Sequence, residues 1–469
     1  MYVTHPVKRA ARLAGCVAFL LLWTGVKSVA AYTIPAAASY QFTPGQELVY
    51  EGTKQDWFGK NDPADLAISW RLWVLDVDKQ GCGDLLIEYC AKRGAEVEER
   101  YLFRVAVECD GRTHWNPTLA ALPAWLSPRQ IVPQLPTDEE TQNGAWRCVE
   151  PRSGMRWEYR RNEGTDDSRL DFVATCQGPL EDVSVGSLQF DFEFDKAAGH
   201  LVRFHSQGEW KDYNEHNEET LALTNAATHD AAFTRTLRAD VERLFSTVEE
   251  CRQLVGRHDM AKLVRPSSEG TLTERFAKAK ASLVAAQAAN QSPQLDEHYQ
   301  GQLQAQERRA GYLLGENATN SRLQSVAKAI DQPSPEWTAE DLQKSSHALA
   351  DYRGKVVVLD FWFRKCNYCI RAQPQFEAVI NRFKDKPVAF LGVNIDENPA
   401  DADFAVAQLK TTYPTLRGIE IQKLYPASGA PTWIVIDPAG IVRAVHVGYS
   451  GFLEEELTET IEKLLKVPG

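Results

Sequence analysis

Apolar and polar residues alternate through much of residues 32–229, which is the spacing of β-strands with one buried face. The clearest apolar positions are Ile68, Trp70, Leu72, Val74, Leu188, Phe190, Phe192 and Phe194. Glycine-containing turns follow both segments, at residues 81–83 and 198–199. We therefore expect a β-rich domain over residues 32–229, and no motif in it identifies a function.

Aromatic residues are concentrated in this β-rich region, which holds eight of the chain's 12 tryptophans. Aromatic side chains at strand spacing are explained by burial without any ligand. The pattern favours a sandwich with an aromatic core, and the alternative is an exposed aromatic binding surface.

Between residues 230 and 330 the apolar spacing changes to that of helices. The apolar stripe consists of Leu237, Val241, Leu244, Val248, Cys251 and Val255. Residues 271–289 and 297–311 are rich in good helix formers. We expect a helical spacer over residues 230–330, in which Cys251 has a packing role.

The pattern changes again at residue 331. Strands are expected at 356–362, 388–395, 432–436 and 441–447, and helices at 366–383, 403–410 and 454–465. The first strand is an unbroken apolar run of the kind that is buried on both faces. Strands that alternate with helices indicate a layered α/β domain over residues 331–469. The chain as a whole is therefore expected to be multidomain.

Residues 1–31 have the character of an export signal. Basic residues precede an apolar run from Ala14 to Val26, and small residues follow it. The run is shorter than the roughly 20 residues that span a bilayer, so we expect a signal peptide, with an uncleaved N-terminal anchor as the alternative. Either would place the rest of the chain in the periplasm or another extracytoplasmic compartment.

The charge of the chain is acidic. The formal net charge is −12, and it becomes −16 without the four positive charges of residues 1–31. Because nucleic acids and anionic membranes are bound by clustered Lys and Arg, this balance argues against both as partners.

Nine cysteines are present, and Cys16 would leave with an export signal. In an exported chain the remaining even number allows structural disulfides. Six lie before the α/β domain: Cys82, Cys90, Cys109, Cys148, Cys176 and Cys251. We expect one or two bridges among them, with no defined pairing; the alternative is that each is a small buried hydrophobe.

The other two cysteines form a C-x-x-C motif where the first buried strand passes into a helix. At a helix start, unpaired N–H groups and the helix dipole stabilise an anion, so Cys366 should be the reactive thiolate. Cys369, one turn later, is placed to resolve a mixed disulfide. Arg364 and Lys365 directly precede the motif and should favour the thiolate further.

A zinc site is the competing use of such a motif, but a closed site needs four ligands. The only histidines in this domain, His347 and His446, stand alone in the sequence. We therefore expect no metal and no other cofactor.

The segment 352–362, which ends three residues before the C-x-x-C, resembles the TlpA/ResA branch of thioredoxin-like proteins. The resemblance extends to Gly429-Ala430-Pro431-Thr432 and to Asp437-Pro438-Ala439-Gly440. It covers the C-terminal domain only.

The resemblance implies a thioredoxin-like fold and assigns roles to four residues. Cys366 matches the attacking cysteine and Cys369 the resolving one. Pro431 matches the cis-proline that faces the dithiol, where the backbone of Ala430 could pair with an extended substrate segment. Asp360 matches a buried acid that exchanges a proton with the resolving cysteine, and burial would raise its pKa. The alternative for Asp360 is a structural acid that is hydrogen-bonded to the backbone.

Three positions depart from the family pattern. Lys365 replaces the tryptophan that usually precedes the first cysteine, Tyr368 replaces a proline, and Ala372 replaces a glutamate. These changes concern the redox potential and the choice of partner, so neither property is carried over from the family.

These features predict an extracytoplasmic thiol–disulfide oxidoreductase that acts on protein dithiols or disulfides and exchanges electrons with a redox donor. The resemblance implies reduction of protein disulfides, as in cytochrome c maturation. One alternative is a redox-sensing binding or scaffold protein that uses the β-rich domain. Another is a peroxiredoxin-type peroxidase, although Phe363 stands where those enzymes carry threonine.

Overall fold

The computed structural model describes residues 38–58, 64–115, 128–149, 156–162, 168–176, 185–210, 215–256, 259–265, 267–314, 319–409, 411–427, 429–449 and 452–466. The expected export signal or anchor at residues 1–31 lies outside these residues. Within the described part of the chain, no helix is both long enough and apolar enough to cross a membrane.

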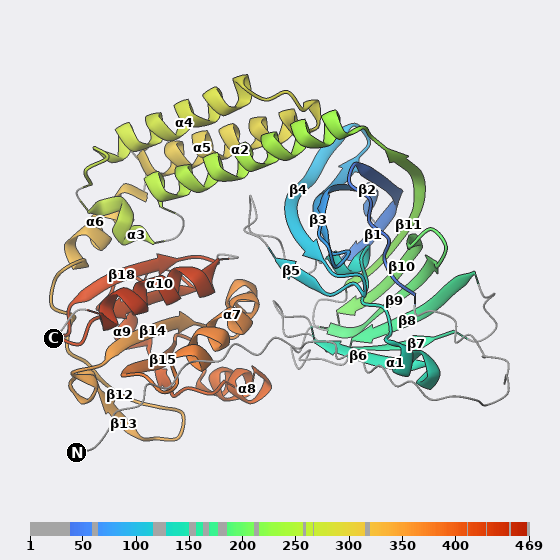
Figure 1. The fold of residues 1–469 in the computed structure, drawn as a ribbon. Coiled ribbons are helices and arrows are strands. Elements are labelled where there is room, and N and C mark those ends of the chain that lie inside the picture. The colour runs from blue at the N-terminus through green and yellow to red at the C-terminus, as the bar shows by residue number, and fades with distance from the viewer. Residues whose placement is uncertain are drawn as a thin grey trace, which may run out of the picture. The chain divides into compact units, whose positions relative to one another are not determined.

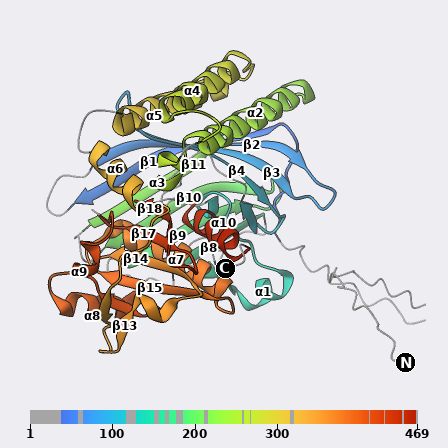
Figure 2. The ribbon, with the colours of Figure 1, turned by 90° about the vertical axis from the view of Figure 1, so that its left-hand side faces the viewer.

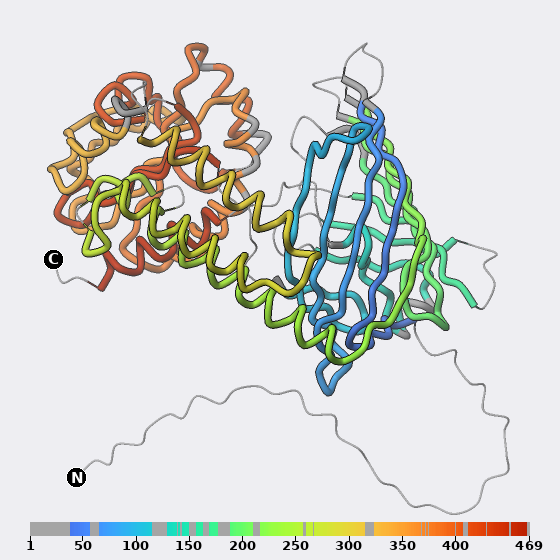
Figure 3. The backbone as a smooth tube through the Cα atoms, turned by 90° about the horizontal axis from the view of Figure 1, so that it is seen from above, coloured from blue at the N-terminus to red at the C-terminus, as the bar shows by residue number. Residues whose placement is uncertain are grey.

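An 11-stranded antiparallel sheet contains the described strands of the β-rich region, in the order β5-β4-β3-β2-β1-β11-β10-β9-β8-β7-β6 (Figure 1). The strands are β1 (Gln46–Phe58), β2 (Ala64–Val77), β3 (Gly83–Arg93), β4 (Glu96–Val107), β5 (Thr113–Trp115), β6 (Ala145–Val149), β7 (Arg156–Arg161), β8 (Arg169–Cys176), β9 (Val185–Asp195), β10 (His200–Trp210) and β11 (Glu215–Thr228). Two meanders thus meet where β1 pairs with β11, and Figure 3 shows the blue strands beside the green ones.

The sheet curves strongly and buries aromatic side chains from many of its strands (Figure 1). The ring of Trp70 lies edge-on to Tyr89 and Phe103, with centroids 5.1 and 6.3 Å apart. Buried Trp70, Trp146 and Trp157 belong to this core, whereas buried Trp73 packs in a different cluster, with Leu237 and Val241. The expected aromatic core is therefore present, but one curved sheet closes over it in place of the expected sandwich, as strand twist and curvature allow.

The expected structural disulfides of the β-rich and helical regions do not form. Cys82, Cys90, Cys109, Cys148, Cys176 and Cys251 are not joined in disulfides. Cys148 on β6 and Cys176 on β8 are both register partners of Trp157 on β7, so two strand spacings, about 9–10 Å, separate them. That exceeds the reach of a disulfide. Cys251 is buried and its thiol donates to the Ala279 carbonyl at 3.3 Å, in agreement with a packing role.

Helices follow the sheet: α2 (Ala231–Val255), α3 (Met260–Val264), α4 (Leu272–Ala288), α5 (Asp296–Leu314) and α6 (Thr319–Ala329). Helix α2 packs along α4, and α4 packs along α5, as Figures 1 and 2 both show. Asp230 caps α2 by accepting the N–H of Phe233 at 2.8 Å, and Thr271 with Glu274 forms a capping box on α4. The apolar stripe of α2 is buried in this helix packing.

The C-terminal region contains a five-stranded sheet in the order β16-β15-β14-β17-β18. Strands β14, β15 and β16 are parallel to one another, β17 is antiparallel to β14, and β18 is antiparallel to β17. Its elements are β14 (Val356–Trp362), α7 (Asn367–Phe383), β15 (Val388–Asn394), α8 (Pro399–Leu409), β16 (Thr415–Arg417), α9 (Ile419–Gln422), β17 (Thr432–Ile436), β18 (Val442–Val447) and α10 (Leu453–Leu465), preceded by the hairpin of β12 (Thr338–Glu340) and β13 (Ser346–Ala348). A βαβ unit followed by an antiparallel hairpin and a final helix is the thioredoxin-like arrangement that the resemblance implies.

Strand β14 is buried along its whole length, as its apolar run predicts. Val356 and Val358 pack in one cluster with Phe376 of α7 and Leu457 of α10. Because side chains alternate along a strand, Asp360 projects to this same face, beneath the helix that begins at the C-x-x-C.

Candidate active site

Cys366 and Cys369 are joined in a disulfide at the start of α7, with their Cα atoms 5.2 Å apart. Cys366 is the N-cap residue of the helix, and its Sγ accepts the N–H of Cys369 at 3.1 Å. The same N–H also donates to the Cys366 carbonyl at 2.9 Å, so the first sulfur lies against the N–H groups of the first turn of the helix. The same position would stabilise a thiolate after reduction, because the N-terminal end of a helix favours negative charge.

The two basic residues before the motif are arranged differently from each other. Arg364 Nη1 lies 2.6 Å from Asp401 Oδ1, and its guanidinium lies over the ring of Phe404, 4.1 Å from the centroid. Lys365 is exposed. The charge of Arg364 is therefore neutralised by Asp401, which weakens the expectation that both residues assist the thiolate.

Asp360 is buried on β14, where its Oδ2 accepts a hydrogen bond from the Tyr413 hydroxyl at 3.0 Å. Burial raises its pKa to about 7, although the bond from Tyr413 opposes the shift; the nearby charge of Glu377 adds to it. A carboxyl with this pKa can both take up and release a proton near neutral pH. The hydrogen bond to Asp360 comes from a side chain, and both the proton-exchange role and the structural role of this acid stay predictions.

The Ala430–Pro431 peptide bond is cis, as the resemblance implies. The Pro431 carbonyl accepts the N–H of Gly448 at 2.9 Å, which ties this loop to the end of β18. Ala430 packs against a small buried cluster of Trp362, Cys366, Cys369 and Ala405. The fold therefore brings residues about 65 positions apart in sequence to one place beside the disulfide.

Two tyrosines near the site were not predicted from the sequence. The ring of Tyr449 stacks on exposed Tyr368, with centroids 6.1 Å apart. Tyr413, from the loop before β16, provides the hydrogen bond to Asp360. Neither Tyr413 nor Tyr449 lies in a motif, so only tertiary contact identifies them.

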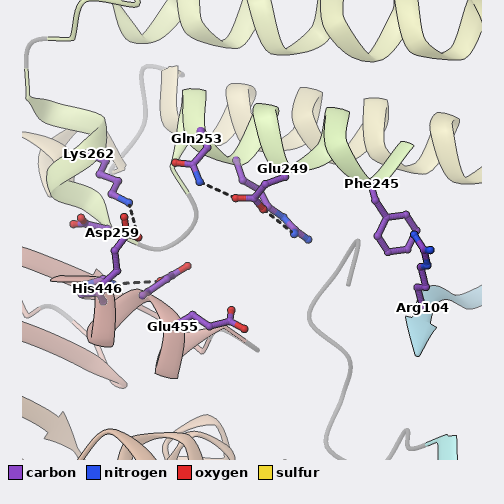
Figure 4. Close-up of a pocket in the computed structure, with 11 residues that line it drawn as sticks. Arg104, Phe245, Glu249, Gln253, Asp259, Lys262, His446 and Glu455 are labelled. Carbon is purple, nitrogen blue, oxygen red and sulfur yellow. Dashed lines mark hydrogen bonds and ion pairs between the residues drawn. The ribbon is translucent and has the colours of Figure 1, made fainter. Parts of the chain in front are cut away.

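A separate cavity of about 690 Å³ lies beside α3, β18 and α10 (Figure 4). It is lined by charged side chains that include Asp259, Lys262 and Glu456, together with His446. The Nδ1 atom of buried His446 lies 3.3 Å from Glu456 Oε2. Neither cysteine of the disulfide lines this cavity.

Comparison with known proteins adds to this geometry. A sequence profile described as the AhpC/TSA family matches residues 330–445. Thiol-disulfide oxidoreductase ResA of Geobacillus kaustophilus is 30% identical over 132 residues, which are 28% of this chain and 76% of the relative. The chain belongs to the ResA-type thiol-disulfide oxidoreductases.

The ResA-type similarity concerns the C-terminal domain. ResA of Geobacillus thermodenitrificans is 27% identical over 143 residues, 30% of this chain and 81% of the relative. Among solved structures, a thioredoxin domain of a thiol-disulfide oxidoreductase from Bacteroides vulgatus is 29% identical and covers 29% of this chain and 99% of its own, with a TM-score of 0.27. As a ResA-type protein, the chain is an oxidoreductase with a thioredoxin-like C-terminal domain.

Proposed function

We propose that this protein is an extracytoplasmic thiol–disulfide oxidoreductase that reduces protein disulfides through Cys366 and Cys369. The observation that carries the proposal is the disulfide across the N-terminus of α7, packed against the loop that holds the cis Ala430–Pro431 bond. This arrangement combines a stabilised thiolate, a resolving cysteine one turn away and an adjacent backbone segment for a substrate.

The proposed reaction transfers two electrons. A redox donor first reduces the Cys366–Cys369 disulfide to a dithiol, which takes up two protons. The Cys366 thiolate then attacks one sulfur of the substrate disulfide, so that a mixed disulfide forms and one substrate thiolate leaves. The Cys369 thiolate next attacks Cys366 Sγ, which releases the second substrate sulfur and restores the protein disulfide.

We assign Asp360 to the second step of this reaction. Its carboxylate would take the proton of the Cys369 thiol and thereby generate the attacking thiolate, and the protonated carboxyl would return the proton during reduction of the protein. A pKa of about 7 suits both directions, since neither form is strongly disfavoured near neutral pH. Ala430, next to the cis-proline, is assigned to backbone pairing with the substrate.

Single-turnover reduction of a protein disulfide by the reduced full chain tests the mechanism. Cys366→Ala should lower the rate to that of the uncatalysed reaction, because the attacking thiolate of the proposed mechanism is missing. Cys369→Ala should instead accumulate the mixed disulfide, since the resolving thiolate is missing. Cys109→Ala, which removes an exposed cysteine outside any disulfide, is the matched control and should be fully active. Reduction that survives in Cys366→Ala would refute the mechanism.

The direction of electron flow follows from the potential of the dithiol. Equilibration in thiol/disulfide buffers, with alkylated cysteines counted by mass, measures it. A value near roughly −270 mV would agree with a reductant, whereas one near roughly −120 mV would identify an oxidant.

In a peroxidase, Cys366 would react with a peroxide in place of a disulfide. Reduced protein should then consume hydrogen peroxide rapidly and without a disulfide substrate, which we do not expect with Phe363 at the position where peroxiredoxins carry threonine. Peroxide consumption lost in Cys366→Ala would favour that function.

The proposed location rests on the composition of residues 1–31. N-terminal sequencing of the protein from fractionated cells distinguishes a cleaved signal from a retained anchor. Recovery of the whole chain from the cytosol with residue 1 intact would refute the extracytoplasmic assignment.

A further inference from the structure

Asp360 lies at the inner end of a row of hydrogen-bonding side chains that reaches the protein surface. The Tyr413 hydroxyl lies 3.0 Å from Asp360 Oδ2 and 3.2 Å from Gln373 Oε1. Gln373 Nε2 donates to Glu377 Oε1 at 3.2 Å. Exposed Thr412 donates to the same carboxylate, from its N–H at 3.2 Å and from its hydroxyl at 2.8 Å. The row thus connects β14, the loop before β16 and α7, the helix that begins at the disulfide.

The hydroxyl of Tyr413 has one hydrogen and two acceptors within reach. When Asp360 is ionised, its carboxylate is the stronger acceptor, so the hydroxyl donates to it. When Asp360 is protonated, the carboxyl can donate to Tyr413 Oη, and the hydroxyl is then free to donate to Gln373. Both protonation states of a buried carboxyl are therefore hydrogen-bonded, in a place where an unsatisfied polar group is costly.

We propose that Tyr413 is a positioning residue for proton exchange at Asp360, because its hydroxyl turns between Asp360 and Gln373 as the carboxyl loses or gains a proton. The proposal rests on the proposed function, in which that proton comes from the Cys369 thiol and returns to it. No bond between heavy atoms changes. The single proton moves between Asp360 and Cys369, while Tyr413 changes only the acceptor to which it donates.

Removal of the Tyr413 hydroxyl should affect the ionised state of Asp360 most, because that state loses a charge-assisted bond. In Tyr413→Phe, we expect the acid limb of the pH–rate profile for disulfide reduction to move from about pH 7 to higher pH by about one unit. The rate should fall about fivefold at pH 7 and be nearly unchanged at pH 9, as follows from the ionised fraction of a carboxyl with the shifted pKa.

Removal of the second acceptor should have the opposite effect. Gln373→Met takes away the acceptor that the hydroxyl uses when Asp360 is protonated, so the acid limb should move to lower pH. A tyrosine that only fills space would not give opposite shifts at these two positions. Tyr425→Phe is the matched control, since its hydroxyl bonds to Ser334 at 2.6 Å and to Trp337 Nε1 at 3.0 Å, outside this row. It should leave the acid limb unchanged.

Two further measurements separate this proposal from the proposed function. In an Asp360→Asn background, Tyr413→Phe should no longer shift the pH profile, because the hydroxyl acts through Asp360. Infrared titration of the oxidised full chain follows the carboxyl band that Asp360→Asn removes, and it requires no turnover. If the titration of that band shifts in opposite directions in Tyr413→Phe and Gln373→Met, but the protein does not reduce disulfides, the proposal for Tyr413 stands and the proposed function is rejected.

The proposal for Tyr413 is wrong if the carboxyl band titrates with the same midpoint pH in the wild-type protein, Tyr413→Phe and Gln373→Met, whatever their activity. Circular dichroism establishes that each variant is folded. Should Tyr413→Phe fail to fold, the expected shift of Gln373→Met to lower pH decides the question alone.

Discussion

At the scale of single residues, Asp360 is held where its ionisation opposes folding. Its pKa rises from 3.8 to about 7 because burial disfavours the charged carboxylate, with Tyr413 opposing the shift and Glu377 adding to it. Below pH 3.8 the carboxyl is protonated in both the folded and the unfolded chain. Between pH 3.8 and about 7 the unfolded chain ionises first, so stability falls as pH rises; above that range the penalty is constant.

Asp360→Asn should remove this pH dependence. Relative to the wild-type protein, the variant should gain free energy of unfolding between pH 4 and pH 8, by at most about 4 kcal/mol. Urea denaturation at both pH values measures the difference. Asp403→Asn, at an exposed position of α8, is the control and should show no such gain. If Asp360→Asn changes the free energy of unfolding equally at both pH values, burial does not raise the pKa of the Asp360 carboxyl.

At the scale of elements, the pairing of β1 with β11 joins the two meanders of the large sheet and depends on one glycine. A Cβ atom on Gly52 would lie 1.7 Å from the carbonyl oxygen of Thr220 on β11, far inside van der Waals contact. The backbones of β1 and β11 can approach this closely only because residue 52 has no side chain.

Gly52→Ala should therefore force β1 and β11 apart and destabilise the protein by about 2–3 kcal/mol. Gly301→Ala is the control, because an added Cβ on this residue of α5 has no atom within 4 Å. That substitution should stabilise by about 0.5–1 kcal/mol through helix propensity. Urea denaturation of both variants checks the two opposite signs, and equal stability of Gly52→Ala and the wild-type protein would contradict the close approach.

At the scale of the whole molecule, the helical region contacts the thioredoxin-like domain through α3 and β18. Asp259 forms an isolated β-bridge with His446, and Lys262 of α3 lies near it (Figure 4). Burial disfavours the charged imidazolium of His446, but its hydrogen bond to Glu456 and the charges of Asp259 and Glu456 outweigh burial and the repulsion from Lys262. The pKa of His446 is therefore raised above 6.5.

The folded state thus binds the His446 proton more tightly than the unfolded chain. The resulting stabilisation is fully present below pH 6.5 and is lost as the pH rises through the raised pKa. His446→Gln should accordingly destabilise more at pH 5.5 than at pH 8.5 in urea denaturation. A larger loss at pH 8.5 would mean that His446 is neutral in the folded protein.

Local patterns determined much of this protein from the sequence alone. The apolar run before the C-x-x-C predicts buried β14, and the expected strand at 432–436 agrees with β17 at both ends. The step from strand to helix places Cys366 at the N-cap of α7. These predictions succeed because strand and helix spacing and helix capping depend on residues close together in the chain.

Tertiary structure decided everything that requires distant residues to meet. It placed Cys148 and Cys176 on strands two positions apart, so the expected bridges could not form there. It curved a single sheet over the aromatic core in place of a sandwich. It also brought Tyr413, 53 residues along the chain, to the carboxyl of Asp360. The sequence alone determined which elements form and where the dithiol lies; only packing between elements decided which side chains share the dithiol's surroundings, because such contacts have no local period in the chain.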